Sequence, residues 1–191
     1  MDEPLQNAAE FLAALREGIP HYDTLQDELV RATRGLEVRS ILDLGAGTGE
    51  TSRRLLATHP RAKVTAVDPS EEALRSAGAV LGDRAQLRLA ELFEPLPHGP
   101  FDVIVSALSV HTLRPADRTR LLTRALRVLA PGGRIVIADA ITPGIELPGQ
   151  AVDPRAPDRL EVLVNRCIDA GLQPRVIWSA EDLAVVAAVA R

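Results

Sequence analysis

Ile41-Leu42-Asp43-Leu44-Gly45-Ala46-Gly47-Thr48-Gly49-Glu50 is an apolar strand that leads straight into a turn with glycine at every second position. Glycine adopts backbone conformations that other residues avoid, and it lets another molecule approach the chain closely. Such a run at the end of a strand therefore indicates a turn built around a ligand. A helix is expected to begin near Thr48. The alternative is a tight strand-to-helix turn that binds nothing.

The spacing of the three glycines separates two families of α/β sheet. They stand at 45, 47 and 49, whereas the dinucleotide fingerprint G-x-G-x-x-G needs the third glycine one residue later. The stretch from Asp43 to Gly49 resembles the first motif of the class I S-adenosylmethionine (SAM) dependent methyltransferases, Asp/Glu-x-Gly-x-Gly-x-Gly. The resemblance implies that Asp43, Gly45, Ala46, Gly47 and Gly49 bind SAM, and that S-adenosylhomocysteine (SAH) is the product.

The resembled family also implies an architecture. We expect a doubly wound α/β fold with a seven-stranded, mostly parallel sheet in the order 3-2-1-4-5-7-6, an antiparallel last strand, and N-terminal helices over the cleft. The 191 residues suit one domain, with 1–35 as a helical lid and 36–191 as a Rossmann-like core.

Composition narrows the function classes. A net charge of −4 disfavours nucleic acid or an anionic membrane as the main partner. The longest apolar run near the end, 183–190, is far shorter than a membrane span, and the acidic start lacks the features of a signal peptide, so we expect a cytoplasmic protein. Cys167 is the only cysteine and is expected to be a core residue, and we expect no metal site.

Two helices are expected before the sheet, at 5–17 and 23–34, separated by Gly18-Ile19-Pro20. Thr24-x-x-Asp27 can act as a capping box for the second. In the resembled family such helices often lie over the cleft, which makes His21 and Tyr22 candidates for a lid contact and for catalysis. The alternative is that Tyr22 only packs and His21 lies in solvent.

Residues 63–68 form a short buried strand that ends in Asp68. A parallel strand beside the first places this carboxylate next to the glycine turn, where its oxygens can accept hydrogen bonds from both hydroxyls of a ribose. Pro69 follows as a further cofactor neighbour, and Ser70 is expected to cap the next helix. Asp68 is therefore the expected ribose ligand.

The next strand, 85–90, is followed by Glu91-Leu92-Phe93. The resembled family usually has Gly-Asp-Ala here, and its acid accepts the adenine amino group. Glu91 and Leu92 inherit those cofactor roles by position, although glutamate departs from the pattern. The alternative for Glu91 is a surface acid.

A near-continuous apolar strand at 103–108 includes Ser106, a further candidate cofactor residue, and its carboxyl end should face the reacting centre. Ser109-Val110-His111-Thr112-Leu113 resembles the Ser/Ala-Leu-x-x-His-His-Leu segment of small-molecule methyltransferases, with Thr112 in place of the second histidine. His111 is the first candidate for a catalytic base near neutral pH. It could equally orient the acceptor or hold the loop by a backbone hydrogen bond.

The rest of the chain is expected to complete the sheet. A helix from Pro115 to about 130 carries arginines at 114, 118, 120, 124 and 127, which we interpret as a solvated face. A tight turn at 131–133 precedes a strand at 134–139, and 142–159 reads as an irregular linker. A helix at about 158–170 precedes two strands, 173–179 and 182–190, that should form an antiparallel hairpin.

The leading hypothesis is a methyltransferase (EC 2.1.1.-) that transfers a methyl group from SAM to a small-molecule acceptor, with secondary metabolism as one setting. A tRNA or protein methyltransferase is the second hypothesis. The third is a protein that binds SAM without methyl transfer, for example a cyclase. Hydride transfer with NAD is disfavoured by the glycine spacing. A homodimer is left open, and the sequence does not name the acceptor.

Overall fold

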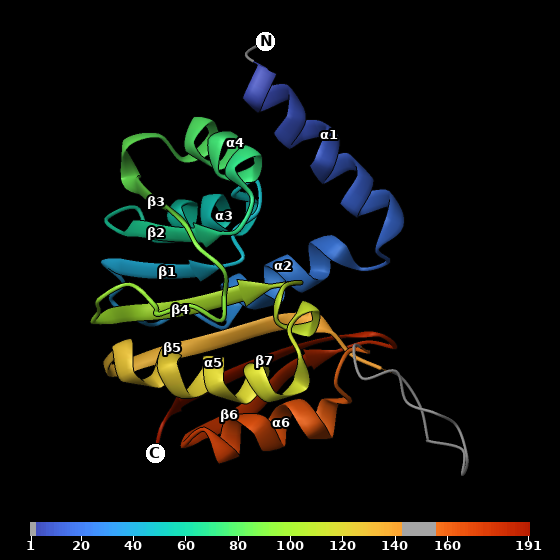
Figure 1. The fold of residues 1–191 in the computed structure, drawn as a ribbon, viewed down its shortest axis with the longest axis vertical. Helices are drawn as coiled ribbons and strands as arrows, with labels where there is room; N and C mark the ends of the chain where they lie inside the picture. The colour runs from blue at the N-terminus through green and yellow to red at the C-terminus, as the bar shows by residue number, and fades with distance from the viewer. Residues whose placement is uncertain (1–2, 143–155) are drawn as a thin grey trace.

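The computed structural model describes residues 3–142 and 156–191, with side chains from residue 8 onward. Figure 1 shows a twisted sheet with helices on both faces and α1 reaching across one end. The helices are α1 (Glu3–Gly18), α2 (Tyr22–Arg31), α3 (Glu50–Thr58), α4 (Glu71–Leu81), α5 (Pro115–Val128) and α6 (Leu160–Asp169), with short 3-10 turns at Gly82–Arg84 and Val110–Thr112. The strands are β1 (Ser40–Leu44), β2 (Lys63–Asp68), β3 (Ala85–Leu89), β4 (Phe101–Ala107), β5 (Leu129–Ala140), β6 (Leu172–Ser179) and β7 (Leu183–Ala190).

The sheet has seven strands in the order β3-β2-β1-β4-β5-β7-β6. Strands β1 to β5 pair in parallel, whereas β7 runs antiparallel between β5 and β6. The expected fold class is confirmed, including the closing hairpin. The carboxyl ends of β1, β2 and β4 therefore meet at one edge of the sheet, which is where parallel α/β folds bind ligands.

Helices cover both faces of the sheet, so successive residues of a strand point into two different hydrophobic cores. Ile41 packs with helices α2, α3 and α4, whereas its neighbour Leu42 packs with α5 and α6. The same alternation separates Val103 from Ile104. This is why the central strands read as continuous apolar runs.

Two helix starts differ from the expectation. Helix α2 begins at Tyr22 rather than 23, and its N-cap residue is His21 in the left-handed conformation (φ 62°), so Thr24 is not the cap. Helix α3 begins at Glu50, because the left-handed Gly49 still belongs to the turn. The cap of α4 is confirmed, since the Ser70 hydroxyl accepts the Ala73 N–H at 3.2 Å.

Strand β5 starts earlier than expected and contains the predicted turn. Leu129 pairs with Phe101 and Arg134 with Val103, so residues 130–133 bulge out of the ladder. Most of the expected linker, 143–155, lies outside the described residues. No helix in the described part of the chain is both long and apolar enough to cross a bilayer.

Candidate functional site

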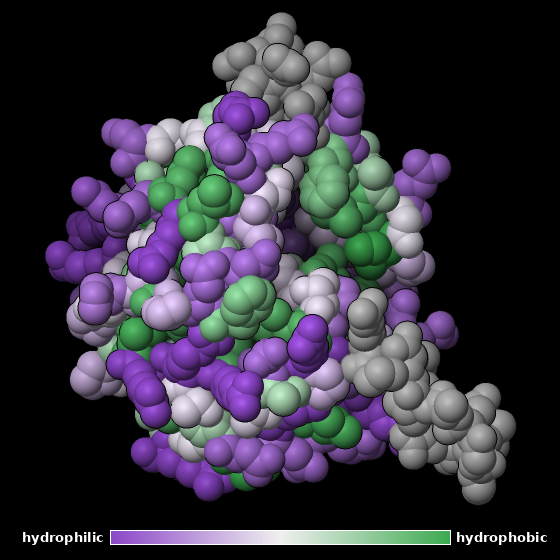
Figure 2. All heavy atoms as spheres, viewed as in Figure 1, coloured by the Kyte–Doolittle hydropathy of each residue, from purple (hydrophilic) through white to green (hydrophobic). Residues whose placement is uncertain are grey.

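A cavity of about 510 Å³ opens where the glycine turn faces the N-terminal helices. Figure 2 shows this face hollowed beside the apolar flank of α1. Its lining consists of Phe11, Leu15, Tyr22, Gln26, Gly45, Ala46, Gly47, Thr48, Glu50, Thr51, Asp68, Ser70, Glu72, Ala73, Ser76, Ala107, Leu108 and Ser109. The cavity thus collects the carboxyl ends of β1, β2 and β4 and closes them with α1 and α2, as the fold prediction required.

The three glycines of the turn all have positive φ, but they serve different purposes. A Cβ on Gly45 would lie 2.2 Å from Ser109 Oγ, so this glycine lets the loop after β4 approach the turn. A Cβ on Gly49 would press on Ala77 at 3.2 Å, so this glycine packs the start of α3 against α4. Gly47 has open space beside it and lines the cavity, so it is the position where a ligand can contact bare backbone.

Asp68 ends β2 and lines the cavity with its carboxylate held from both sides. Oδ2 accepts the Gly47 N–H at 2.8 Å, and Oδ1 accepts the Ser70 N–H at 2.9 Å. A carboxylate oxygen can accept a second hydrogen bond. The turn and the acid therefore fix each other and leave acceptor capacity for two hydroxyls of a ligand.

Asp43 lies fully buried beneath the turn and does not line the cavity. Its Oδ2 accepts the Ser52 hydroxyl at 2.6 Å, while Oδ1 has no partner among the described residues. Burial raises the pKa of Asp43 to about 6. This side chain ties β1 to α3 and leaves one buried acceptor directly below the glycine turn.

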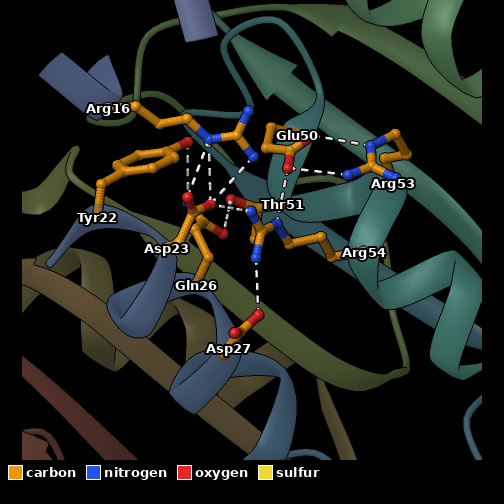
Figure 3. A network of polar contacts seen from close by, with 9 residues as sticks. All are labelled: Arg16, Tyr22, Asp23, Gln26, Asp27, Glu50, Thr51, Arg53 and Arg54. Carbon is orange, nitrogen blue, oxygen red and sulfur yellow. Dashed lines mark hydrogen bonds and ion pairs between the residues drawn. The ribbon is translucent and has the colours of Figure 1, made fainter. Parts of the chain in front are cut away.

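The wall of the cavity formed by α2 and α3 carries polar groups. The Thr51 hydroxyl donates to Gln26 Oε1 at 3.0 Å, and Gln26 Nε2 donates to the Tyr22 hydroxyl at 3.3 Å. Glu50 binds Arg53 at 2.8 Å and Arg54 at 2.7 Å, and Figure 3 shows this network drawn from α1, α2 and α3. These bonds place Tyr22, Gln26 and Glu50 on one wall.

His111 forms a pair with a carboxylate that the sequence analysis did not single out. Its Nδ1 lies 2.6 Å from Asp139 Oδ1, and its backbone N–H donates to Asp139 Oδ2 at 2.9 Å. The hydrogen bond to Asp139 raises the pKa of His111, against the opposing effect of burial. Asp139 lies at the carboxyl end of β5, on the same edge of the sheet as Asp68. Its position at the end of a predicted parallel strand was the feature of the sequence that could have identified it as a site residue.

Arg118 holds the loop that carries His111. The sequence analysis placed Arg118 on a solvated face, which is wrong, because its side chain is only 1% exposed. It donates to the carbonyls of His111 at 2.6 Å and Leu113 at 2.9 Å and pairs with Asp158 at 2.8 Å. A buried guanidinium needs such a full set of acceptors, and here they come from the loop and from the segment entering α6.

Glu91 lies outside the cavity, exposed, in a groove of about 850 Å³. That groove also includes Phe93 and Arg124, whose guanidinium donates to the carbonyl of Leu92 at 2.8 Å. Although the groove is the larger hollow, it lacks the glycine turn and the Asp68 carboxylate, so the smaller cavity is the candidate site. Leu92 is buried against the apolar core on the α5 side of the sheet.

Three further predicted residues lie away from the cavity. Ser106 is fully buried and donates to the Leu44 carbonyl at 2.7 Å, so it joins β4 to β1. Pro69 is exposed next to Asp68. His21 is exposed with its ring edge against Trp178, at a centroid distance of 6.3 Å.

These residues fit a SAM molecule in three respects. Gly47 offers bare backbone, Asp68 offers two oriented carboxylate oxygens, and the cavity volume lies within the range of small-molecule sites. Leu108, at the rim, has φ 53°, an unfavourable value for leucine. Strain of this kind persists at positions that the surrounding structure fixes, and it often marks a functional edge.

Comparison with known proteins identifies a known domain in the middle of the chain. Residues 41–133 match the family described as "Methyltransferase domain". Trans-aconitate 2-methyltransferase from Azoarcus sp. (strain BH72) is 35% identical over 123 residues, which cover 61% of this chain and 47% of that protein. The 27-O-demethylrifamycin SV methyltransferase from Amycolatopsis mediterranei (strain S699) is 35% identical over 105 residues, covering 52% and 38%. The chain spans about half the length of the curated relatives it matches.

Solved structures share the fold over nearly the whole chain. The DhpI-SAM-HEP complex has a TM-score of 0.77 at 20% identity and covers 97% of this chain and 94% of its own. The [4+2]-cyclase SpnF has a TM-score of 0.73 at 16% identity, covering 88% and 81%. The glycine motif, the strand order and the matched domain agree: residues 41–133 carry a methyltransferase domain, and the chain has the class I, Rossmann-like fold of SAM-dependent methyltransferases.

Proposed function

We propose that this protein binds SAM in the cavity at the glycine turn and transfers its methyl group to a small-molecule acceptor, leaving SAH. The observation that carries the proposal is the Asp68 carboxylate, which is fixed by the N–H groups of Gly47 and Ser70 at the edge of a 510 Å³ cavity. A ribose diol fits two such oxygens. When bound, SAM supplies an electrophilic methyl group on a sulfonium.

The chain's own residues then have three tasks. The glycine turn holds the methionine half of SAM, and Asp68 holds the ribose. Glu91 and Leu92 do not line the cavity, and they stay the proposed adenine contacts only through their position after β3. Leu108 and Ser109 follow β4 and border the remaining cavity, where the acceptor would bind. Holding the acceptor atom against the methyl group supplies most of the rate acceleration, because little covalent chemistry is asked of the protein.

His111 is the proposed base for an acceptor that must lose a proton. With Nδ1–H donating to Asp139, Nε2 is the nitrogen left to take that proton. The side chain is 29% exposed, so it can exchange the proton with solvent. His111 does not line the cavity, although Ser109, two residues before it, does. If the acceptor needs no base, the same pair holds the loop in place.

A small-molecule acceptor is supported by relatives. They include the rifamycin enzyme above and a 3-hydroxy-5-methyl-1-naphthoate 3-O-methyltransferase from Streptomyces sahachiroi, 31% identical over 131 residues. We propose a similar setting in secondary metabolism for this chain, in the cytoplasm. A homodimer stays a prediction, which size-exclusion chromatography with light scattering tests.

One further function keeps the SAM site and omits methyl transfer. A [4+2]-cyclase is among the structural neighbours, which supports retaining this alternative. The tRNA or protein methyltransferase is less favoured, because the net charge of −4 opposes binding of a polyanion.

Turnover distinguishes these functions. The purified protein is incubated with labelled SAM and fractionated cell extract, and SAH is measured by mass spectrometry. Methyl transfer requires SAH to accumulate together with a labelled small product. SAM binding without SAH supports the cyclase alternative, and label in RNA or protein supports the macromolecular one. Binding of NADH with no binding of SAM contradicts the proposal as a whole.

A further inference from the structure

Two hydrogen bonds link side chains along the cavity wall formed by α2 and α3. In both bonds the donor lies on the Thr51 side and the acceptor on the Tyr22 side. Thr51 has its hydroxyl hydrogen directed at Gln26 Oε1, which fixes the Gln26 amide with its NH2 group toward Tyr22. That NH2 donates to the Tyr22 oxygen. Tyr22 therefore accepts in this chain of bonds, and its own O–H is left to donate elsewhere.

The Tyr22 proton has no acceptor among the residues that the structure describes. The residue is 4% exposed and lines the cavity, so its hydroxyl is buried beside the space where a ligand would lie. Burial, reinforced by the charge of Glu50, raises the pKa of Tyr22, so the phenol stays protonated at neutral pH. The group is thus an oriented donor rather than a base, which differs from the catalytic role considered for it from sequence.

Among the described residues, the charged side chains that line the cavity are the acids Glu50, Asp68 and Glu72. No arginine, lysine or histidine lines the cavity in the described part of the chain, so an anion there must be held by neutral donors. The positive end of the α3 dipole begins at Glu50, directly after the glycine turn. Arg53 and Arg54 pair with Glu50 and so reduce the repulsion that its charge exerts on a second carboxylate nearby.

We propose that Tyr22, oriented by Gln26 and Thr51, donates its hydroxyl hydrogen to the carboxylate of the methionine half of SAM. This assignment rests on the proposed function, because it names the contact that this wall makes with the same cofactor. It explains why a helix outside the sheet carries two buried polar side chains in contact, Tyr22 and Gln26.

The arrangement is held in place from outside the cavity. Asp23, next to Tyr22, binds Arg16 of α1 at 3.0 Å and also Arg54 of α3, and Asp27 binds Arg54 at 2.7 Å. Figure 3 shows these ion pairs beside the Tyr22–Gln26–Thr51 chain. Helix α2 is therefore joined to both of its neighbouring helices at the level of the donor.

The test compares two ligands by calorimetry. SAH carries the carboxylate, whereas 5′-methylthioadenosine keeps the thioether, ribose and adenine but lacks the amino-acid end. Tyr22→Phe removes only the hydroxyl, and Thr58→Val, a hydroxyl loss at the carboxyl end of α3 outside both the cavity and the groove, is the matched control. We expect Tyr22→Phe to weaken SAH roughly tenfold, or about 1.4 kcal/mol, and to leave methylthioadenosine unchanged. Thr58→Val should change the affinity for neither ligand.

A second variant tests the direction of the bonds. Gln26→Glu offers only acceptor oxygens, so Tyr22 must turn its hydrogen toward the introduced carboxylate, and SAH affinity should again fall about tenfold or more. In that background, adding Tyr22→Phe should cause no further loss, which a double-mutant cycle measures.

The outcomes separate this inference from the proposed function. If the folded wild-type protein binds neither SAM nor SAH, the proposed function fails. If it binds SAH and Tyr22→Phe binds equally tightly, or weakens both ligands to the same extent, the carboxylate assignment is overturned. Additive losses in the double variant also overturn it.

Discussion

Replacing Asp139 by asparagine should lower the pKa of His111 and weaken the fold in a pH-dependent way. Asp139 is 3% exposed, and its two oxygens accept three N–H groups: His111 N at 2.9 Å, His111 Nδ1 at 2.6 Å and Ala140 N at 2.8 Å. Asparagine has one oxygen and an NH2 that faces a donor. At least one of these hydrogen bonds is lost, at a cost of roughly 1–3 kcal/mol at all pH values.

The pH-dependent part has a definite sign. The folded-state pKa of His111 is raised above the unfolded value of about 6.5. The extra stabilisation from Asp139 is therefore fully present below that unfolded value and is lost as pH rises through the folded pKa. The difference in unfolding free energy between wild type and Asp139→Asn should thus shrink with rising pH, by about 1.4 kcal/mol for each unit by which the two folded-state pKa values differ.

Two measurements must agree. NMR titration of the four histidines, with His111→Ala to assign the signal, gives the two pKa values. Urea unfolding at several pH values between roughly 5.5 and 8.5, on either side of the ordinary histidine pKa, gives the free energies. Asp102→Asn is the control, because Asp102 also accepts backbone N–H groups but contacts no histidine. An unchanged His111 titration in Asp139→Asn, or a stability difference that does not vary with pH, would refute the pairing.

Three further changes test the structure around the site. Arg118→Met should lower the unfolding free energy by about 3 kcal/mol, measured by urea denaturation. The reason is that the change leaves three backbone carbonyls and one oxygen of Asp158 without the Arg118 donor. His59 has its pKa lowered by burial, so wild type should lose stability relative to His59→Gln as pH falls from about 7 to 5.5; parallel pH profiles would contradict this. Gly45→Ala should destabilise the fold by more than the roughly 1–3 kcal/mol of its positive φ alone, because its Cβ meets Ser109 at 2.2 Å; a melting temperature equal to wild type would exclude the clash.

Much of this fold could be predicted from the sequence, because several of its features depend on interactions between residues close together in the chain. The glycine spacing, the serine at position 70 and the paired strands at the end each act over a few residues, so their structural consequences follow from the pattern alone. The same holds for Asp68, because the end of a buried parallel strand fixes where its last side chain lies.

The contacts between distant segments could not be read in this way. Helical periodicity cannot show that Arg118 points at a segment 40 residues later, so the side chain looked solvated. The pairing of His111 with Asp139 spans 28 residues and depends on β4 and β5 being neighbours. The start of α2 was misplaced because the left-handed conformation of His21 replaces a side-chain cap, which no residue pattern announces.

The central claim, that SAM binds with its ribose on Asp68, is tested most directly by calorimetry of SAM and SAH with wild type and Asp68→Ala. Loss of charge-assisted hydrogen bonds to the ribose should weaken both ligands roughly tenfold or more. Circular dichroism must show that the variant is folded, and Asp102→Asn should bind like wild type. Equal affinity of a folded Asp68→Ala protein and wild type would contradict the account.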